Sequence, residues 1–168
     1  MAAETTVLDI VKGAILLEHK GKALYDSVAK TTAVPAVKEL FAWLAEEEVK
    51  HIAFLEKQFQ RLVKGEGMHG VPEEHDHREA IDAVLAEEIV KSVSGAGYEA
   101  AVISAALEFE KRAVAYYSDQ RDQTRSKSEK EVFGWLAKWE TTHMEMLAKV
   151  DDDLKQEIWY DNQFWPLD

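Results

Sequence analysis

The 168-residue sequence predicts an all-α fold, an antiparallel four-helix bundle made of two duplicated helical hairpins with a long crossover between the second and third helices. Three observations lead to this prediction. Four long segments carry apolar residues at alternating spacings of three and four, which is the period of an inward-facing helical stripe. The second half of the chain repeats the first half. The connections within each half are short, so consecutive helices must run in opposite directions.

The repeat is clearest around two aromatic-rich segments. Residues 41–45 read FAWLA, and residues 133–137, which lie 92 positions later, read FGWLA. Over the 17-residue windows 41–57 and 133–149, eight positions are identical, whereas unrelated segments with ordinary residue frequencies would share about one. We interpret the chain as an internal duplication of a two-helix unit.

The first half contains two predicted helices. The first helix is expected from about Thr5, a residue suited to capping, to about Lys30. After a short turn, Pro35 is well placed to start the second helix. This helix should reach about Lys64, because glycines follow there.

The crossover and the third helix come next. Residues 65–96 form a long connection, and the third helix is expected from Gly97 or Tyr98 to about Arg121. The connection includes an amphipathic piece that we expect to form an accessory helix. Its apolar residues are Ile81, Val84, Leu85 and Ile89.

The fourth helix is expected to start at Ser128, which would cap it together with Glu131 in a capping box. It should fade around residues 151–153 or continue to about Glu157. The tail, residues 158–168, is too aromatic to be left in water, so we expect it to pack on the bundle or on a partner subunit. Its apolar residues are Ile158, Trp159, Tyr160, Phe164, Trp165 and Leu167.

Six ionisable residues interrupt the apolar stripes at equivalent positions of the two halves. An unpaired buried carboxylate costs several kcal/mol, and four at one level would repel one another strongly. Two divalent metal ions would neutralise four carboxylates, and oxygen and nitrogen ligands without thiolate suit iron or manganese, and zinc less well. The predicted ligands are Glu18, Glu48, His51, Glu110, Glu140 and His143.

These residues resemble the ferritin-like di-iron carboxylate superfamily, in which two helices give one Glu each and two give Glu-x-x-His. A Tyr seven residues after each lone Glu, at Tyr25 and Tyr117, is most similar to the rubrerythrin branch. The resemblance implies two bound iron ions, with manganese or zinc as possible substitutes. It also implies that Glu48 and Glu140 bridge the metals, with each His binding one metal and each lone Glu acting as a terminal ligand.

Rubrerythrin-like proteins reduce hydrogen peroxide with electrons from a rubredoxin-type centre, which implies a role in oxidative stress. This chain has no cysteine and therefore no rubredoxin module, so an external donor, a rubredoxin- or flavin-type reductase, is expected. It also departs from the family at Ala113, where rubrerythrins carry an extra ligand Glu; the repeat equivalent is Gly21. Small residues at both positions would leave room for an oxygen ligand.

Several alternatives stay open at this stage. The plain six-ligand set also fits a ferroxidase of the bacterioferritin type, an oxygenase of organic substrates, a non-catalytic protein whose metals hold the bundle, or a metal-free buried polar layer. Tyr25 and Tyr117 are either core fillers or second-sphere residues that hydrogen-bond a ligand carboxylate or relay a proton or radical. Trp43 and Trp135 are expected to be packing residues, and His19 a surface residue.

Glu-x-x-His also occurs at Glu66–His69 and Glu74–His77, but in a stretch punctuated by Gly and Pro, so we expect these to be solvated loop residues. The cluster containing His75 and His77 could bind adventitious metal.

Composition limits the remaining possibilities. A net charge of −12 without a basic stripe argues against nucleic-acid binding. The sequence contains no run of about 18 apolar residues, so no membrane span is predicted. The N-terminus lacks the pattern of a secretory signal, so a cytoplasmic location is expected. We expect one domain over residues 1–168, and the aromatic tail suggests a homodimer.

Overall fold

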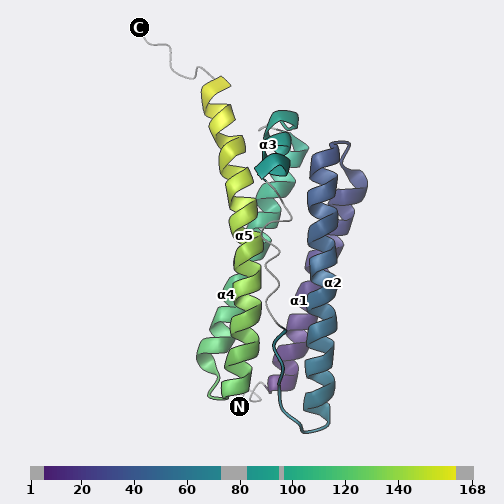
Figure 1. Ribbon diagram of the computed structural model, residues 1–168, viewed down its shortest axis with the longest axis vertical. Helices are drawn as coiled ribbons and strands as arrows, with labels where there is room; N and C mark the ends of the chain where they lie inside the picture. The colour runs from purple at the N-terminus through teal and green to yellow at the C-terminus, as the bar shows by residue number, and fades with distance from the viewer. Residues whose placement is uncertain (1–5, 73–82, 95–96, 162–168) are drawn as a thin grey trace, which may run out of the picture.

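The computed structural model describes residues 6–72, 83–94 and 97–161 (Figure 1). In this part of the chain there are five helices and no strand, which confirms the predicted all-α class. None of the described helices is long and apolar enough to cross a membrane. The helices are α1 (Val7–Thr31), α2 (Pro35–Val63), α3 (Ala83–Ser92), α4 (Tyr98–Gln123) and α5 (Lys127–Asp161).

The four long helices form a bundle of two antiparallel hairpins. Helices α1 and α2 make one hairpin, and α4 and α5 make the other beside it (Figure 1). Between the hairpins, α1 packs against α4 and α2 packs against α5. The Tyr116 hydroxyl of α4 donates to the Ile10 carbonyl of α1 at 2.9 Å, and Trp139 Nε1 of α5 donates to Glu47 Oε2 of α2 at 3.1 Å.

The predicted accessory helix is confirmed as α3, which packs across one end of the bundle (Figure 1). Ile89 is fully buried there in the same apolar cluster as Leu40 and Leu154. Val84 is 59 % exposed, so it lies outside the apolar face to which the sequence pattern assigned it. Ile81 lies outside the described residues.

Two of the predicted helix starts are wrong by one or two residues. The cap of α1 is Thr6 instead of Thr5, because Thr6 accepts from the Asp9 amide while the Asp9 carboxylate accepts from the Thr6 amide. At α5, the Ser126 hydroxyl accepts from the Glu129 amide at 3.4 Å, so the helix starts before Ser128.

Glu131 is therefore already within α5 and pairs with Lys127 at 3.8 Å instead of closing a capping box. At its far end α5 continues to Asp161, beyond the predicted end. The side chains of the predicted aromatic tail lie outside the described residues.

Among the described residues, the core consists of two apolar clusters, which the ionisable residues separate along every long helix. One cluster lies on the α3 side of the bundle and includes Tyr25, Phe41, Leu44 and Leu147. The other lies towards the opposite end and includes Val11, Leu55, Tyr117 and Phe133. Burying one such large apolar side chain stabilises the fold by about 1.5–3 kcal/mol. The two clusters thus hold the four helices in register around a polar layer.

Candidate metal centre

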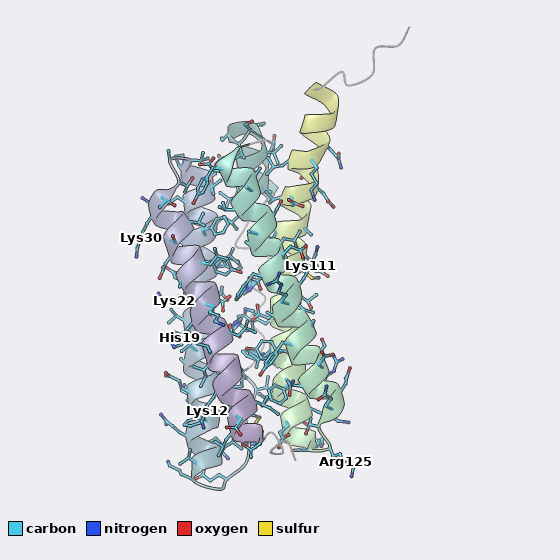
Figure 2. The ribbon with its side chains drawn as sticks, turned by 180° about the vertical axis from the view of Figure 1, so that it is seen from behind. Lys12, His19, Lys22, Lys30, Lys111 and Arg125 are labelled. Atoms are coloured by element: carbon cyan, nitrogen blue, oxygen red, sulfur yellow. The ribbon has the colours of Figure 1, made fainter. Side chains whose placement is uncertain are left out.

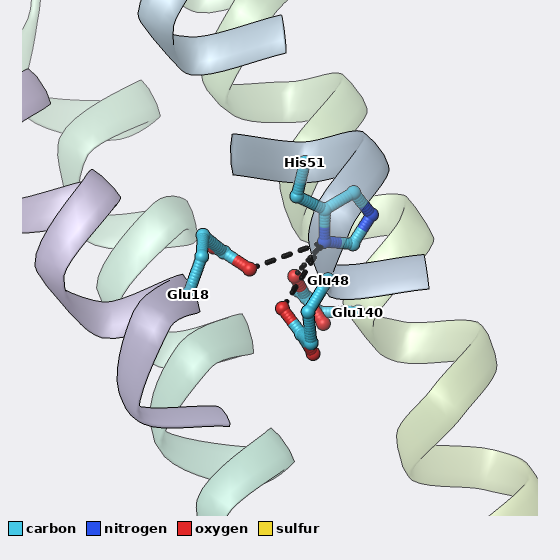
Figure 3. Close-up of side chains that lie close together, drawn as sticks. All are labelled: Glu18, Glu48, His51 and Glu140. Atoms are coloured by element: carbon cyan, nitrogen blue, oxygen red, sulfur yellow. Dashed lines mark hydrogen bonds and ion pairs between the residues drawn. The ribbon is translucent and has the colours of Figure 1, made fainter. Parts of the chain in front are cut away.

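The structure brings all six predicted ligands together in the middle of the bundle. Glu18 comes from α1, Glu48 and His51 from α2, Glu110 from α4, and Glu140 and His143 from α5, and none is more than 2 % exposed. Because Glu and His are three residues apart on α2 and on α5, each pair lies on one face of its helix, about one turn apart. Figure 3 shows Glu18, Glu48 and Glu140 converging on the His51 ring.

The six residues form two overlapping groups of potential ligands. One group is Glu18, Glu48, His51 and Glu140, and the other is Glu48, Glu110, Glu140 and His143. Within each group the candidate ligand atoms all lie within 4.8 Å of one another. Glu48 and Glu140 belong to both groups, so they occupy the positions that two metal ions would share.

Both imidazoles turn Nδ1 towards the carboxylates. His51 Nδ1 lies 2.9 Å from Glu140 Oε1, 3.2 Å from Glu18 Oε2 and 3.6 Å from Glu48 Oε2 (Figure 3). His143 Nδ1 lies 3.2 Å from Glu140 Oε2 and 3.8 Å from Glu110 Oε1. The two rings stack with centroids 5.7 Å apart and an interplanar angle of 27°. Nδ1 is therefore the nitrogen that each His would offer to a metal.

Crowding of carboxylates in a buried layer perturbs their protonation. Burial raises the pKa of Glu48 and of Glu110 well above the usual range, and the neighbouring Glu140 carboxylate raises both further. Burial likewise raises the pKa of Glu140. At Glu18, burial also acts to raise the pKa, but hydrogen bonds with Glu48, His51 and Tyr117 outweigh it and lower the pKa to about 2. Without a cation, the layer therefore holds protons on some of its carboxyls.

The pKa values of the two histidines are shifted in opposite directions. Burial acts to lower the pKa of His51, but the Glu140 carboxylate and the hydrogen bonds to Glu140, Glu18 and Glu48 raise it well above the usual range. At His143, burial prevails and lowers the pKa to about 4. A neutral imidazole is the form that binds a metal, and metal binding releases protons from such a site.

The donor set fits two divalent cations. Several polar atoms in the layer are buried without a hydrogen-bond partner in the described structure: Glu48 Oε2, His51 Nε2, Glu110 Oε2 and His143 Nε2. Buried polar atoms without partners cost about 1–3 kcal/mol each, and carboxylate oxygens in this state are free to accept a metal–ligand bond. Four carboxylates would balance four positive charges, and the N and O ligands suit iron or manganese.

The two tyrosines of the repeat hold the lone Glu residues across the hairpins. The Tyr25 hydroxyl of α1 donates to Glu110 Oε1 of α4, and the Tyr117 hydroxyl of α4 donates to Glu18 Oε1 of α1. Both tyrosines are fully buried, and burial raises their pKa well above the usual range, so both are protonated donors. Each phenol thus fixes the orientation of a carboxylate on the opposite hairpin.

Tryptophans cover the imidazoles on the α2/α5 side of the bundle. The Trp43 ring lies edge-on to His143 with centroids 5.3 Å apart, and the Trp139 ring lies edge-on to His51 at 5.4 Å. Trp135 packs on Trp139 at 4.9 Å. It also borders an open pocket of about 490 Å³ formed with residues 69–71 and the start of α5.

Sequence reasoning missed Glu47 and Trp139. Glu47 is buried next to the candidate ligand Glu48, pairs with Lys50, and accepts the hydrogen bond from Trp139 Nε1. These two residues occupy equivalent positions of the repeat, 92 residues apart, but differ in type. The signal in the sequence is that this position of the repeat, adjacent to Glu48 and Glu140, is Glu in one half and Trp in the other.

The other candidate residues lie apart from the centre. Glu66 pairs with Arg61 at 3.2 Å, and the His69 main chain is held by Gln58, so this Glu-x-x-His belongs to the loop after α2. Glu74, His75 and His77 lie outside the described residues. His19 is exposed on the outer side of α1 (Figure 2).

The expected room beside Gly21 is filled. A Cβ atom at Gly21 would lie 2.8 Å from Phe109 Cε1 and 3.3 Å from the Glu48 carboxyl group.

Comparison with known proteins gives one finding. The family model described as Rubrerythrin matches residues 9–151, which include all six residues of the centre. Neither curated proteins nor solved structures give a significant match.

Proposed function

This chain belongs to the rubrerythrin family, and from that premise we propose that it is a redox-active di-iron protein that reduces peroxide with electrons from an external donor. The observation that carries the proposal is the pair of overlapping ligand groups sharing Glu48 and Glu140. Two adjacent metals that share carboxylates can together give or take two electrons, which is the number that cleaves a peroxide O–O bond.

The residues of the chain have separable roles in this proposal. His51 and His143 would each hold one iron through Nδ1, and Glu18 and Glu110 would each serve one iron as a terminal ligand. Tyr25 and Tyr117 would keep those terminal carboxylates in place through their hydroxyl groups. The apolar clusters at both ends and the tryptophans at the side would exclude water, which strengthens the electrostatic interactions inside.

The overall reaction requires electrons from outside the chain. Reduction of one hydrogen peroxide to two waters takes two electrons and two protons, and the chain has no cysteine to hold an iron–sulfur centre. A rubredoxin- or flavin-type reductase would provide the electrons. We expect such a donor to dock on the side of Trp135 and Trp139. Trp139 contacts His51, and Trp135 contacts both Trp139 and the pocket beside residues 69–71.

A ferroxidase of the bacterioferritin type is the second candidate. Ala113 favours it, because the residue stands where rubrerythrins carry an additional ligand Glu and leaves the plain six-ligand set. Oxidation of added Fe(II) that continues beyond two ions per chain would support this candidate. Turnover of peroxide with an added reductase, and no such continued oxidation, would support the peroxidase.

The first experiment is the metal content of protein purified from its native host, by mass spectrometry, for the wild type and for Glu48→Ala and Glu140→Ala. Glu47→Gln is the matched control, because Glu47 is equally buried on the same helix but lies outside both ligand groups. We expect about two iron ions per chain in the wild type and the control, and loss of iron in the two alanine variants.

The second experiment is anaerobic reduction of the iron-loaded protein followed by addition of hydrogen peroxide. The absorption of the oxidised centre should return with one equivalent of peroxide per chain. A loaded protein that ignores both peroxide and dioxygen, and unfolds when the metal is removed, would indicate a purely structural metal centre.

A further inference from the structure

The metal centre is covered unequally on its different sides. Fully buried aromatic and aliphatic side chains close it along the bundle axis in both directions. Three tryptophans pack against the imidazoles on the α2/α5 side. On the α1/α4 side, which faces the viewer in Figure 2, the inward positions next to the lone Glu residues are the small Gly21 and Ala113.

One half-buried ring fills the space that Gly21 leaves. Because Gly21 has no Cβ, the Phe109 ring of α4 can approach the α1 backbone, and both this ring and the Glu48 carboxyl group border the place where a Cβ would be. The same ring lies edge-on to Tyr25 with centroids 6.1 Å apart and an interplanar angle of 82°. Phe109 therefore lies between the solvent and two groups of the centre, the Glu48 carboxyl and the phenol that holds Glu110.

The duplication makes this cover asymmetric. The repeat equivalent of Phe109 is Leu17, which precedes Glu18 as Phe109 precedes Glu110. A crevice of about 240 Å³ opens on the same side, and Leu17 and Lys20 of α1 and Arg112 of α4 contribute to its lining. Lys20 is the neighbour of Gly21, and Arg112 is one helical turn from Phe109. Phe109 and Gly21 are not part of this lining, although Lys20 and Arg112 are their near neighbours in the sequence.

We propose that Phe109, seated against Gly21, determines the size of the oxidant that reaches the metal centre. Small uncharged molecules such as hydrogen peroxide pass when the ring moves slightly, whereas organic hydroperoxides with a bulky substituent are excluded. Lys20 and Arg112, which line the crevice on this side, disfavour entry of Fe(II) there. This inference rests on the proposed function and names the substrate class of that reaction.

The test compares two oxidants with two ligands that bind the metal without oxidising it. The reduced di-iron protein is mixed with hydrogen peroxide and with cumene hydroperoxide in a stopped-flow instrument, for the wild type, Phe109→Ala, Phe109→Leu and Leu17→Ala. In parallel, azide and the larger imidazole are added to the Co(II)-loaded proteins, and their binding rates are followed by the visible absorption of Co(II). Far-UV circular dichroism verifies that each variant is folded.

In Phe109→Ala, we expect the reaction with cumene hydroperoxide and the binding of imidazole to become about tenfold faster or more. The rate of reaction with hydrogen peroxide and the rate of azide binding should change less than about threefold. Phe109→Leu should lie between the wild type and Phe109→Ala. Leu17→Ala should retain the wild-type discrimination, because Leu17 is the repeat equivalent of Phe109, whereas the repeat equivalent of Gly21 is Ala113, which already carries a Cβ atom.

Equal acceleration of large and small probes in Phe109→Ala, or an equal effect of Leu17→Ala, would overturn the proposal, because either result would mean general loosening of the α1/α4 interface. If the iron protein reacts with neither peroxide while imidazole still enters only the Phe109→Ala variant, the function proposed above fails and the role of Phe109 in access stands. If imidazole binding is unchanged in Phe109→Ala, the role of Phe109 is refuted whatever the peroxide rates are.

Discussion

Substitution of Glu110 by Gln should stabilise the metal-free protein while abolishing its ability to hold two metals. Glu110 Oε1 accepts from Tyr25, whereas Oε2 is buried without a partner among the described residues. Burial and the Glu140 carboxylate raise the pKa of Glu110 well above its usual range. The protonated carboxyl is therefore the form that the metal-free fold favours, and Gln reproduces its shape and neutrality while keeping an oxygen for Tyr25.

The magnitude follows from the cost of keeping a proton on this carboxyl. A free Glu has a pKa of about 4.3, and each pH unit above that value adds about 1.4 kcal/mol to the cost of the protonated form. At pH 7.5 the upper limit is therefore about 4 kcal/mol, and at pH 5.0 it is about 1 kcal/mol. Because the pKa is raised in the folded state, the contribution of Glu110 to stability is present below about pH 4.3 and is lost as the pH rises.

We expect metal-free Glu110→Gln to exceed the wild type in free energy of unfolding by about 2 to 4 kcal/mol at pH 7.5 and by about 1 kcal/mol or less at pH 5.0. Urea unfolding followed by circular dichroism, in the presence of a chelator, measures both values. Glu108→Gln is the control, because Glu108 is exposed near Glu110 on α4 and pairs with Lys111, so it should show no gain that grows with pH. A Glu110→Gln protein that is less stable than the wild type at pH 7.5, or a gain that does not increase with pH, would refute the reasoning.

Three further predictions concern the surroundings of the centre. Removal of the metal by dialysis against a chelator should lower the melting temperature by about 10 °C in calorimetry, because the carboxylates then repel one another; an unchanged melting temperature would contradict the charge balance. Tyr117→Phe removes the donor to Glu18 and should weaken iron binding about tenfold in a competition assay, whereas Tyr116→Phe should leave it unchanged. Trp139→Phe removes the hydrogen bond to buried Glu47 and should lower the free energy of unfolding by about 1–3 kcal/mol without loss of iron, as measured by urea unfolding and metal analysis.

Helix boundaries were predictable to within one or two residues at most ends, and the errors have a local cause. At the start of α5, Ser126 and Ser128 are both suitable caps, and their hydroxyls lie 3.1 Å apart. Which of them begins the helix depends on where the preceding turn leaves the chain, which the capping pattern alone does not specify. Val84 shows a similar limit, since one short amphipathic piece has too few apolar positions to define its buried face.

The residues of the candidate centre could be predicted from the sequence because the same pattern of Glu and His occurs in both halves of the chain. Apolar residues spaced by threes and fours indicate which side of each helix faces the core. The repeat shows that the same ionisable residues occupy that side in both halves. A buried carboxylate needs a compensating charge, so the sequence alone is enough to group the six residues. The amino-acid sequence by itself thus determined the bundle, its two hairpins and the composition of the polar layer.

Only the tertiary structure decided which helix each of these side chains meets. Tyr25 and Tyr117 each bond the lone Glu of the opposite hairpin, Trp139 bonds Glu47, and Phe109 fills the space beside Gly21 on another helix. Periodicity fixes the direction of a side chain relative to its own helix axis, but it carries no information about the axial offset and rotation of the neighbouring helix. Those quantities arise when two apolar clusters pack to full density at either end of the layer, and contacts between hairpins follow from them.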